Sequence, residues 1–461
     1  MDDEPVNLYE GGYQGSIHNI RPQSQRLYDR AFRNILTSGL VLCLVYSAFF
    51  PGGGLLAVVI EDGTTGLGAD VGFYSQAITY ISSIMVALAS PFLISIIGIR
   101  ASLGLGSILY VTIFIGTIFL KAWTIYLGSV ITGMGMGLLW VAAPKVLADN
   151  STEATIRRNS SLWWCIYISS MVFGNLADYF YLGGLSTIDT NTRICIYTVC
   201  CGLIVLATLT GVFGYKDIDS LSENEDLSSF LCSRSIDSRR SSLNRINSES
   251  SLFEKFKAEM ERWKITLLRR EVGYLCVLLV YNAVCLAFYT MTYQTCIGNT
   301  FSSRDLIALM ALIFGFSEVL ACPIFETAAS KFGIKSVAIV LHSISLTAFY
   351  LVFLIFPPNS THESVLDVVT IVKPSSGIVI AIAVLLAVQD SGFNIIATTT
   401  IGIIFQSDSD IGFMLLNGVM SLGTGVMFLI SSYLDLYIIL GISVLLCTSS
   451  TLLIVLDLFK R

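Results

Sequence analysis

Two acidic residues interrupt long apolar stretches in the second half of this 461-residue sequence. Glu318 lies in GFSEVLACP, and Asp390 lies in AVQDSGFNII. Gln389 precedes Asp390, and Asn394 follows it by four residues, so Asp390 and Asn394 share a helix face. An acid in apolar surroundings without a basic partner is either protonated or holds a cation. One interpretation of this pattern is a proton or cation site in the second half of the chain. The alternative is a structural acid that hydrogen-bonds to a neighbouring helix.

The first half offers aromatic and neutral polar candidates for the same substrate or ion site. Trp140 ends the glycine-rich run GMGMGLLW, and Asn175 lies in a later apolar run. We expect Trp140 either to line a central cavity or to pack against a neighbouring helix. The alternating glycines before it are expected to permit close helix packing.

Catalytic and metal-binding patterns are missing from the sequence. None of the three histidines lies near a cluster of Cys, Asp or Glu, and no GxSxG, HExxH or Walker sequence occurs. Most of the eleven cysteines lie inside apolar runs without CxxC spacing. The sequence therefore predicts neither an enzyme nor a cofactor or metal site.

The composition indicates a membrane protein. The chain is 54% hydrophobic and 13% charged, with a mean hydropathy of +0.74, whereas soluble domains carry about 25% charged residues. A membrane-spanning helix needs about 20 apolar residues. No folded basic domain that would bind nucleic acid is present, so the lipid bilayer is the expected surrounding.

Twelve apolar runs follow one another in two sets of six, which predicts an all-α membrane protein with two six-helix bundles. The runs lie at about 36–60, 73–97, 101–120, 123–147, 161–182, 194–214, 273–297, 305–330, 336–357, 377–405, 411–430 and 433–457. The predicted division of the chain is a polar N-terminus (1–35), a first bundle (36–215), a linker (216–272), a second bundle (273–457) and a short tail (458–461).

Basic residues predict the orientation of the chain. All but four of the 27 Lys and Arg residues fall in the two termini, the linker and the connections that share their side. The exceptions are Lys121, Arg193, Arg304 and Lys373. Because cytoplasmic loops are rich in Lys and Arg, both termini and the linker are predicted to be cytoplasmic.

The linker contains two different segments. Residues 219–251 are rich in Ser, Asn and charged residues, which predicts disorder. Within them, RRSSL places two arginines before Ser241 and Ser242, which suits phosphorylation by a basic-directed kinase; an unmodified linker is the alternative. Residues 252–270 have apolar side chains at helical spacing. They predict an amphipathic helix that lies on the inner leaflet or packs against the protein's own cytoplasmic loops.

One glycosylation sequence faces the predicted outer side. Asn359-Ser360-Thr361 lies between the ninth and tenth runs. Two further matches, at Asn150 and Asn159, lie on the predicted cytoplasmic side and should remain unmodified. Asn359 is therefore the candidate glycosylation site.

An internal repeat supports two related halves. ASPFLISIIGIR ends the second run, and ACPIFETAASKFGIK ends the eighth. Pro91 corresponds to Pro323, and Gly98 corresponds to Gly333. Equivalent connections in both halves are expected of two parallel six-helix units.

The order of several motifs resembles the uncoordinated-93-like family of the major facilitator superfamily. These are GMGMGLLW (133–140), RRNSSLWWCIYISSMVFGNL (157–176), YQTCIGNT (293–300), IFGFSEVL (313–320), TAFYLVFL (347–354) and VQDSGFN (388–394). They are most similar to the branch typified by major facilitator superfamily domain-containing protein eleven. The segment IIGIRASL departs from sugar-type facilitators, which have an Asp and an Arg-rich tail there.

The resemblance implies two six-helix bundles around a central cavity, with acids at the positions of Glu318 and Asp390 but no established role for them. Relatives are described as regulatory subunits of potassium channels or as chaperones for membrane receptors. Two functions follow as hypotheses. One is transport of a small solute, coupled to protons; the other is a non-transporting regulatory or trafficking role with a channel or receptor partner. The plasma membrane and endolysosomal membranes both remain open.

Overall fold

Helices form all the regular secondary structure in the residues that the structure describes. The structure is a computed structural model. It describes residues 23–62, 70–152, 154–182, 190–216, 252–301, 304–362, 365, 370–406, 408–431 and 433–456. The phosphorylation candidates Ser241 and Ser242 lie outside these residues.

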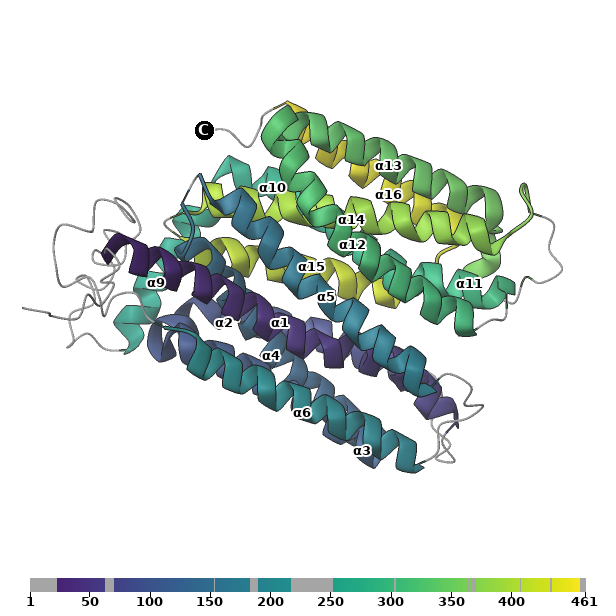
Figure 1. The fold of residues 1–461 in the computed structure, drawn as a ribbon, viewed down its shortest axis with the longest axis horizontal. Coiled ribbons are helices and arrows are strands. Elements are labelled where there is room, and N and C mark those ends of the chain that lie inside the picture. The colour runs from purple at the N-terminus through teal and green to yellow at the C-terminus, as the bar shows by residue number, and fades with distance from the viewer. Residues whose placement is uncertain are drawn as a thin grey trace, which may run out of the picture.

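The helices fall into two groups that are joined through one shorter helix (Figure 1). The first group contains α1 (Gln23–Asp62), α2 (Asp70–Ile108), α3 (Val111–Phe119), α4 (Ala122–Asp149), α5 (Ile156–Leu182) and α6 (Thr190–Gly214). The joining helix is α9 (Leu252–Leu267). The second group contains α10 (Arg270–Ala287), a π-helical turn (Phe288–Thr292), α11 (Tyr293–Phe301), α12 (Arg304–Phe332), α13 (Ile334–Ile355), α14 (Ser376–Ile404), α15 (Ser409–Ile430) and α16 (Leu436–Val455). A 3-10 turn, Pro358–Thr361, follows α13.

The lengths of these helices match a multi-pass membrane protein. Ten segments of the described residues are long and apolar enough to cross a membrane. The segment Tyr74–Phe119 contains two of the twelve predicted runs, and α5 contains a further run that is not among the ten. These two facts account for the difference between ten segments and twelve runs.

The two runs within Tyr74–Phe119 are separated by a reversal at Gly98. Before Gly98, Thr79 and Ser83 lie against Gly133 and Gly137 of α4, so this part runs parallel to α4. After Gly98, Gly106 lies against Leu139, and Thr112 lies against Gly128, so the later part runs antiparallel to α4. The chain therefore crosses the bundle twice here, although the helical hydrogen bonding is nearly continuous.

Gly98 and Gly333 occupy the same backbone conformation, as the internal repeat predicts. Gly98 has φ 79° and ψ 162°, and Gly333 has φ 82° and ψ 155°. A side chain is disfavoured at positive φ, so glycine suits both positions. Pro91 and Pro323 also lie inside the helices that precede these turns.

The glycines before Trp140 allow α4 to pack directly on backbone. A Cβ atom added at Gly133 would lie 2.3 Å from the carbonyl oxygen of Thr79. One at Gly137 would lie 2.4 Å from that of Ser83, and one at Gly135 would lie 2.7 Å from that of Gly106. The prediction of close packing at these glycines is thus confirmed.

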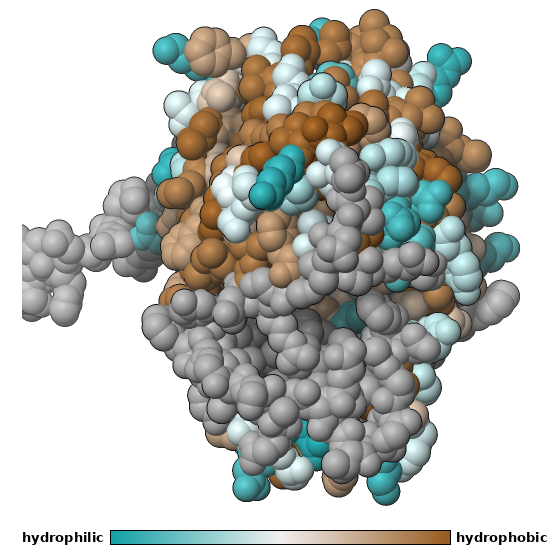
Figure 2. Space-filling view, turned by 90° about the vertical axis from the view of Figure 1, so that its right-hand side faces the viewer, coloured by the Kyte–Doolittle hydropathy of each residue, from teal (hydrophilic) through white to brown (hydrophobic). Residues whose placement is uncertain are grey.

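The two groups meet along α5 with α12 and along α2 with α15. Ser161 Oγ donates to the Cys322 carbonyl at 2.7 Å, and Gly315 lies against Met171. The outward faces of α13 and α16 expose apolar side chains such as Tyr350 and Leu445. These exposed apolar side chains fit contact with lipid. Figure 2 looks along the helices at one end of the molecule, where residues of high hydropathy occupy much of the upper half of the view.

Helices α1 and α9 differ in extent or surroundings from the segments that the sequence predicts. Helix α1 begins at Gln23, directly after Pro22 and earlier than the predicted run at 36–60, because no Gly or Pro lies between Pro22 and Gly39. Helix α9 lies within residues 252–270, for which the sequence predicts an amphipathic helix. It packs on its own protein, since Trp263 and Leu267 contact the core and Phe256 contacts Phe92.

Candidate functional site

A cavity lies between the two helix groups, near the middle of the molecule. Residues from α1, α2, α4, α5, α10, α14 and α15 line it, and eight of them are aromatic. Its free space is about 70 Å³, enough for a few water-sized molecules. None of the described side chains that line it is charged.

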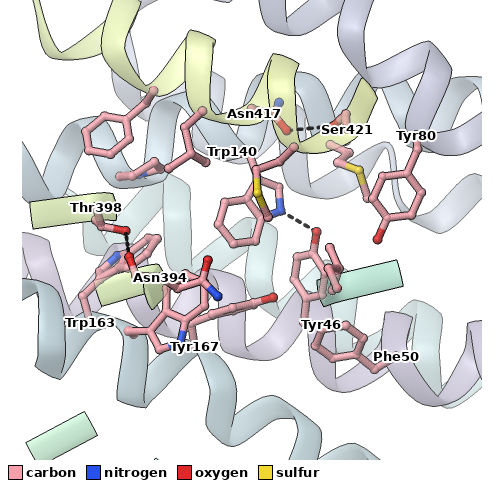
Figure 3. Close-up of a pocket in the computed structure, with 17 residues that line it drawn as sticks. Tyr46, Phe50, Tyr80, Trp140, Trp163, Tyr167, Asn394, Thr398, Asn417 and Ser421 are labelled. Atoms are coloured by element: carbon pink, nitrogen blue, oxygen red, sulfur yellow. Dashed lines mark hydrogen bonds between the residues drawn. The ribbon is translucent and has the colours of Figure 1, made fainter. Parts of the chain in front are cut away.

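Three aromatic rings from different helices form one corner of this cavity (Figure 3). The centroid of Tyr46 lies 5.8 Å from that of Trp140 and 5.2 Å from that of Tyr167. The Trp140 and Tyr167 centroids are 5.1 Å apart. The interplanar angles of the three pairs are 78°, 90° and 87°, so the rings are nearly perpendicular to one another. We call these three residues the aromatic corner.

Neutral polar residues of α15 contribute a second part of the wall and bond to the first helix group. Asn417 Nδ2 donates to the Gly137 carbonyl at 3.3 Å. Ser421 Oγ donates to Asn417 Oδ1 at 3.2 Å and accepts from Ser83 Oγ at 2.8 Å. These bonds connect the two groups beside the cavity.

Asn394 lines the cavity from α14 and is also held by hydrogen bonds. Its Nδ2 donates to the Asp390 carbonyl at 2.9 Å, and its Oδ1 accepts from Asn282 Nδ2 at 3.1 Å. Thr398, one turn later, donates to the Asn394 carbonyl at 2.9 Å. The helical spacing that the sequence shows therefore places Asn394 on the wall and Asp390 one turn away.

Glu318 lies directly behind the cavity wall, where α5, α12 and α14 meet. Its side chain is fully buried, and Oε1 accepts a hydrogen bond from Trp164 Nε1 at 3.3 Å. Trp164 itself lines the cavity. Oε2 has no hydrogen-bond partner among the described residues, although Asp390 lies close enough for the two carboxyl groups to interact electrostatically. We call Glu318 and Asp390 the acid pair.

The other predicted site residues lie elsewhere. Gln389 faces the interior of the second group, where its Oε1 accepts from Tyr281 Oη at 2.6 Å and Ser345 Oγ at 3.1 Å. Asn175 donates to the Met171 carbonyl of its own helix at 2.7 Å. Of the six candidates, Trp140 and Asn394 line the cavity, and the acid pair lies behind it.

The sequence analysis did not single out several residues of the wall. Tyr46, Tyr167, Asn417 and Ser421 line the cavity, but they lie in apolar runs that contain similar residues outside its wall. A usable signal was the pair Asn417 and Ser421, because polar residues four apart share a helix face.

Asn359 lies far from the cavity, in the 3-10 turn that contacts α11. Its side chain is partly exposed. No group of three or more His, Cys, Asp or Glu side chains that could hold a metal ion occurs in the described part of the chain.

A charged cluster holds α9 against the connection between α14 and α15. Arg262 Nε donates to Asp408 at 2.8 Å, one terminal nitrogen donates to Glu259 at 2.7 Å, and the other contacts Asp410. Burial disfavours the charge on Arg262, but Asp410 and Glu259 together raise its pKa above the usual range. Burial raises the pKa of Glu259, although Arg262 acts in the opposite direction. We call these four residues the α9 cluster.

Comparisons with known proteins agree on family and fold. A family profile described as "Ion channel regulatory protein UNC-93" matches residues 64–455. The UNC93-like protein MFSD11 of Xenopus laevis is 29% identical over 431 residues, which cover 91% of this chain and 93% of the relative. That of Xenopus tropicalis is 27% identical over 428 residues, with the same shares covered.

Solved structures of major facilitator superfamily transporters share the fold. The proton:xylose symporter XylE bound to 6-bromo-6-deoxy-D-glucose superposes with a TM-score of 0.68 at 13% identity, covering 92% of this chain and 95% of XylE. FucP in the outward conformation superposes with a TM-score of 0.57 at 12% identity, covering 93% and 100%. The two-bundle architecture predicted from the sequence is therefore confirmed.

Proposed function

Because the chain belongs to the UNC-93 family and has the fold of major facilitator transporters, we propose that it moves a small solute across a membrane in a proton-coupled cycle. In this account the cavity holds the solute and the acid pair carries the proton. The chain is a transporter-like, multi-pass membrane protein. The proton coupling and the transport of a small solute are proposed here.

The position of the acid pair is the observation that carries this proposal. Glu318 bonds to Trp164, which belongs to the opposite helix group and also lines the cavity. The pair lies where α12 and α14 of the second group meet α5 of the first, directly behind the cavity wall. Gain or loss of one proton therefore changes the charge both at the contact between the groups and beside the cavity. A group that binds protons differently in two conformations shifts the equilibrium between them.

The surroundings of the pair suit reversible protonation. The titratable neighbours that interact with Glu318 or Asp390 are Tyr167 of α5 and Tyr289 of the π-helical turn, together with Cys322 and Cys285. No basic side chain contacts the pair among the described residues. Without a fixed counter-charge, neither carboxylate is locked in the ionised form.

An uptake assay tests the proposal. The purified protein is reconstituted in liposomes with an inward proton gradient, exposed to a mixed pool of metabolites and ions, and the contents are analysed by mass spectrometry. We expect one solute to accumulate with the unmodified protein. Glu318→Gln and Asp390→Asn should each reduce gradient-driven accumulation by about tenfold or more.

The matched control is Glu326→Gln, which neutralises another acid of α12 that bonds only to Ser330 of the same helix in the described structure. It should accumulate the solute as the unmodified protein does. No accumulation by folded, reconstituted protein would contradict the proposal. Equal loss in the control and in the acid-pair variants would remove the pair from the mechanism.

A second candidate function is a regulatory or trafficking role with an ion channel or receptor partner. The description of the matching family as ion channel regulators favours it. Cross-linking in native membranes followed by purification would then recover one membrane protein in stoichiometric amount. Recovery of such a partner together with absent uptake would favour regulation, and uptake without a partner would favour transport.

We also propose that the end of the molecule that carries α9 is cytoplasmic, in the plasma membrane or an endolysosomal membrane. The distribution of Lys and Arg supports this orientation. Asn359 would then be glycosylated on the opposite side, and Ser241 and Ser242 would be accessible to cytoplasmic kinases.

A further inference from the structure

The aromatic corner offers π faces rather than charged groups to whatever occupies the cavity. Three nearly perpendicular rings meet at centroid distances of 5.1–5.8 Å. Figure 3 labels the three residues, Tyr46, Trp140 and Tyr167. Trp164 extends this wall, with its centroid 5.1 Å from that of Tyr167. The face of an aromatic ring carries negative potential. Several rings that meet from different directions form a box that attracts a cation.

Many of the hydrogen-bonding groups of the wall are already occupied, although the hydroxyl groups of Tyr80 and Tyr167 have no hydrogen-bond partner among the described residues. Asn417 and Ser421 bond to each other and to the first helix group. Both ends of the Asn394 amide have partners, and Tyr46 Oη accepts from Trp140 Nε1. A neutral polyol needs many free donors and acceptors, because its hydroxyl groups lose their water on binding. This wall provides few, so it suits a solute without many hydroxyl groups.

The charge around the cavity favours a positive occupant. No Lys or Arg is among the described residues of the wall. Lys145, the basic residue next to the lining residue Pro144, is ion-paired with Asp149 at 3.2 Å. The acid pair lies behind Trp164. The hydrogen bond that Trp164 Nε1 donates to Glu318 makes the face of the indole ring more electron-rich. In a poorly hydrated interior these charges act over longer distances than in water.

From this combination we propose that the solute is a small organic cation, such as a quaternary ammonium or a protonated aliphatic amine. This assignment rests on the proposed transport function, since it names the occupant of the same cavity. The rings bind the alkyl groups and the charge together. One carboxyl group of the acid pair carries the proton, while the other stays ionised and stabilises the charge from behind the wall.

Binding of choline compared with its uncharged isostere tests the assignment directly. 3,3-Dimethyl-1-butanol has the shape of choline with carbon in place of nitrogen. Trp140, Trp163 and Trp164 line the cavity, so intrinsic fluorescence of the protein in lipid nanodiscs reports binding. We expect saturable quenching by choline and affinity for the isostere at least about tenfold weaker. Equal affinity for the two compounds, or binding of glucose without binding of choline, would overturn the assignment.

A pair of variants locates the effect in the aromatic corner. Tyr167→Phe keeps the ring, whereas Tyr167→Leu keeps an apolar side chain without a π face. The first should bind choline within about twofold of the unmodified protein, and the second about tenfold more weakly, with the weak binding of the isostere unchanged in both. Equal choline affinity in the leucine variant would also overturn the assignment. The comparison of ligands on the unmodified protein does not depend on the folding of either variant.

The assignment and the proposed function can fail separately. If choline binds but no solute accumulates in liposomes, the transport proposal fails and the recognition of cations stands. If another solute accumulates with the proton gradient while choline neither binds nor competes with it, transport stands and the cation assignment fails.

Discussion

At the scale of single residues, the proposed proton coupling depends on the acid pair. Glu318 is fully buried, with one carboxyl oxygen bonded to Trp164 and with Asp390 as an acidic neighbour. Burying two acids beside each other costs free energy. We propose that the pair is kept despite that cost because it binds a proton.

Glu318→Gln separates proton binding from structural support. The amide oxygen can keep the bond from Trp164 while the ionisable group is removed, so we expect the free energy of unfolding to change by less than about 1 kcal/mol. Thermal unfolding of the purified variant, followed by intrinsic fluorescence, measures this. A much lower melting temperature would instead support a structural acid, the alternative that the sequence left open.

Sequence alone could identify the acid pair but not the aromatic corner. Acids are rare in apolar runs, so Glu318 and Asp390 stand out without any structure. Tyr46 and Tyr167 do not stand out, because aromatic residues are common throughout these helices. Which rings meet depends on how each helix is rotated about its own axis, and the sequence does not give this rotation. The same unknown rotation explains why Gln389 and Asn175, although polar, do not line the cavity.

At the scale of elements, two glycines control how consecutive helices reverse direction. Gly98 and Gly333 have almost identical positive φ, and a Cβ atom at either position would have no neighbour within 4 Å. Backbone conformation therefore explains the glycines better than space does. Sequence predicted this pair through the repeated GIR and GIK, because a short motif around a special conformation is recognisable without tertiary contacts.

Gly98→Ala should destabilise the protein by about 1–3 kcal/mol, because an L-residue is strained at this combination of positive φ and extended ψ. The matched control is Gly202→Ala, which also lies in open space but has ordinary helical geometry. The control should leave the melting temperature unchanged or slightly raise it. Equal effects of the two substitutions would show that conformation is not the reason for glycine at this turn.

The α9 cluster should decide how firmly α9 is held. Arg262→Ala leaves three carboxylates without their shared partner, whereas Arg262→Lys keeps the charge but loses the forked geometry. We expect local stability of α9 to fall by about 1–2 kcal/mol in the alanine variant and by less in the lysine variant, since Arg262 is 28% exposed and solvent screens the pairs. Amide hydrogen exchange of α9 measures this, and unchanged protection in both variants would contradict the role of the cluster.

At the scale of the whole molecule, composition and helical length were sufficient to predict the fold, because each bilayer crossing requires a long apolar helix. Contacts between the halves were not predictable in this way. The α5 and α12 contact depends on small residues such as Gly315 and Ser161, which occur in many apolar helices. The cavity follows from those contacts and therefore required the structure.

The proposed orientation predicts glycosylation at Asn359. In cells that glycosylate membrane proteins, Asn359→Gln should remove the mobility shift that a glycosidase produces with the unmodified protein. Asn150→Gln serves as the control and should retain the shift, because that site lies on the α9 side. Loss of the mobility shift in Asn150→Gln but not in Asn359→Gln would contradict the proposed orientation, because it would place the α9 end on the non-cytoplasmic side of the membrane.

Proton movement driven by the solute tests the central claim most directly. Liposomes that contain the protein and an internal pH-sensitive dye, with no initial proton gradient, would receive a pulse of the solute identified by uptake, with choline as the first probe. The account predicts a change of internal pH that saturates with solute concentration and is absent in Asp390→Asn. Solute uptake without any change of internal pH, or a pH change that persists in Asp390→Asn, would contradict coupling through the acid pair.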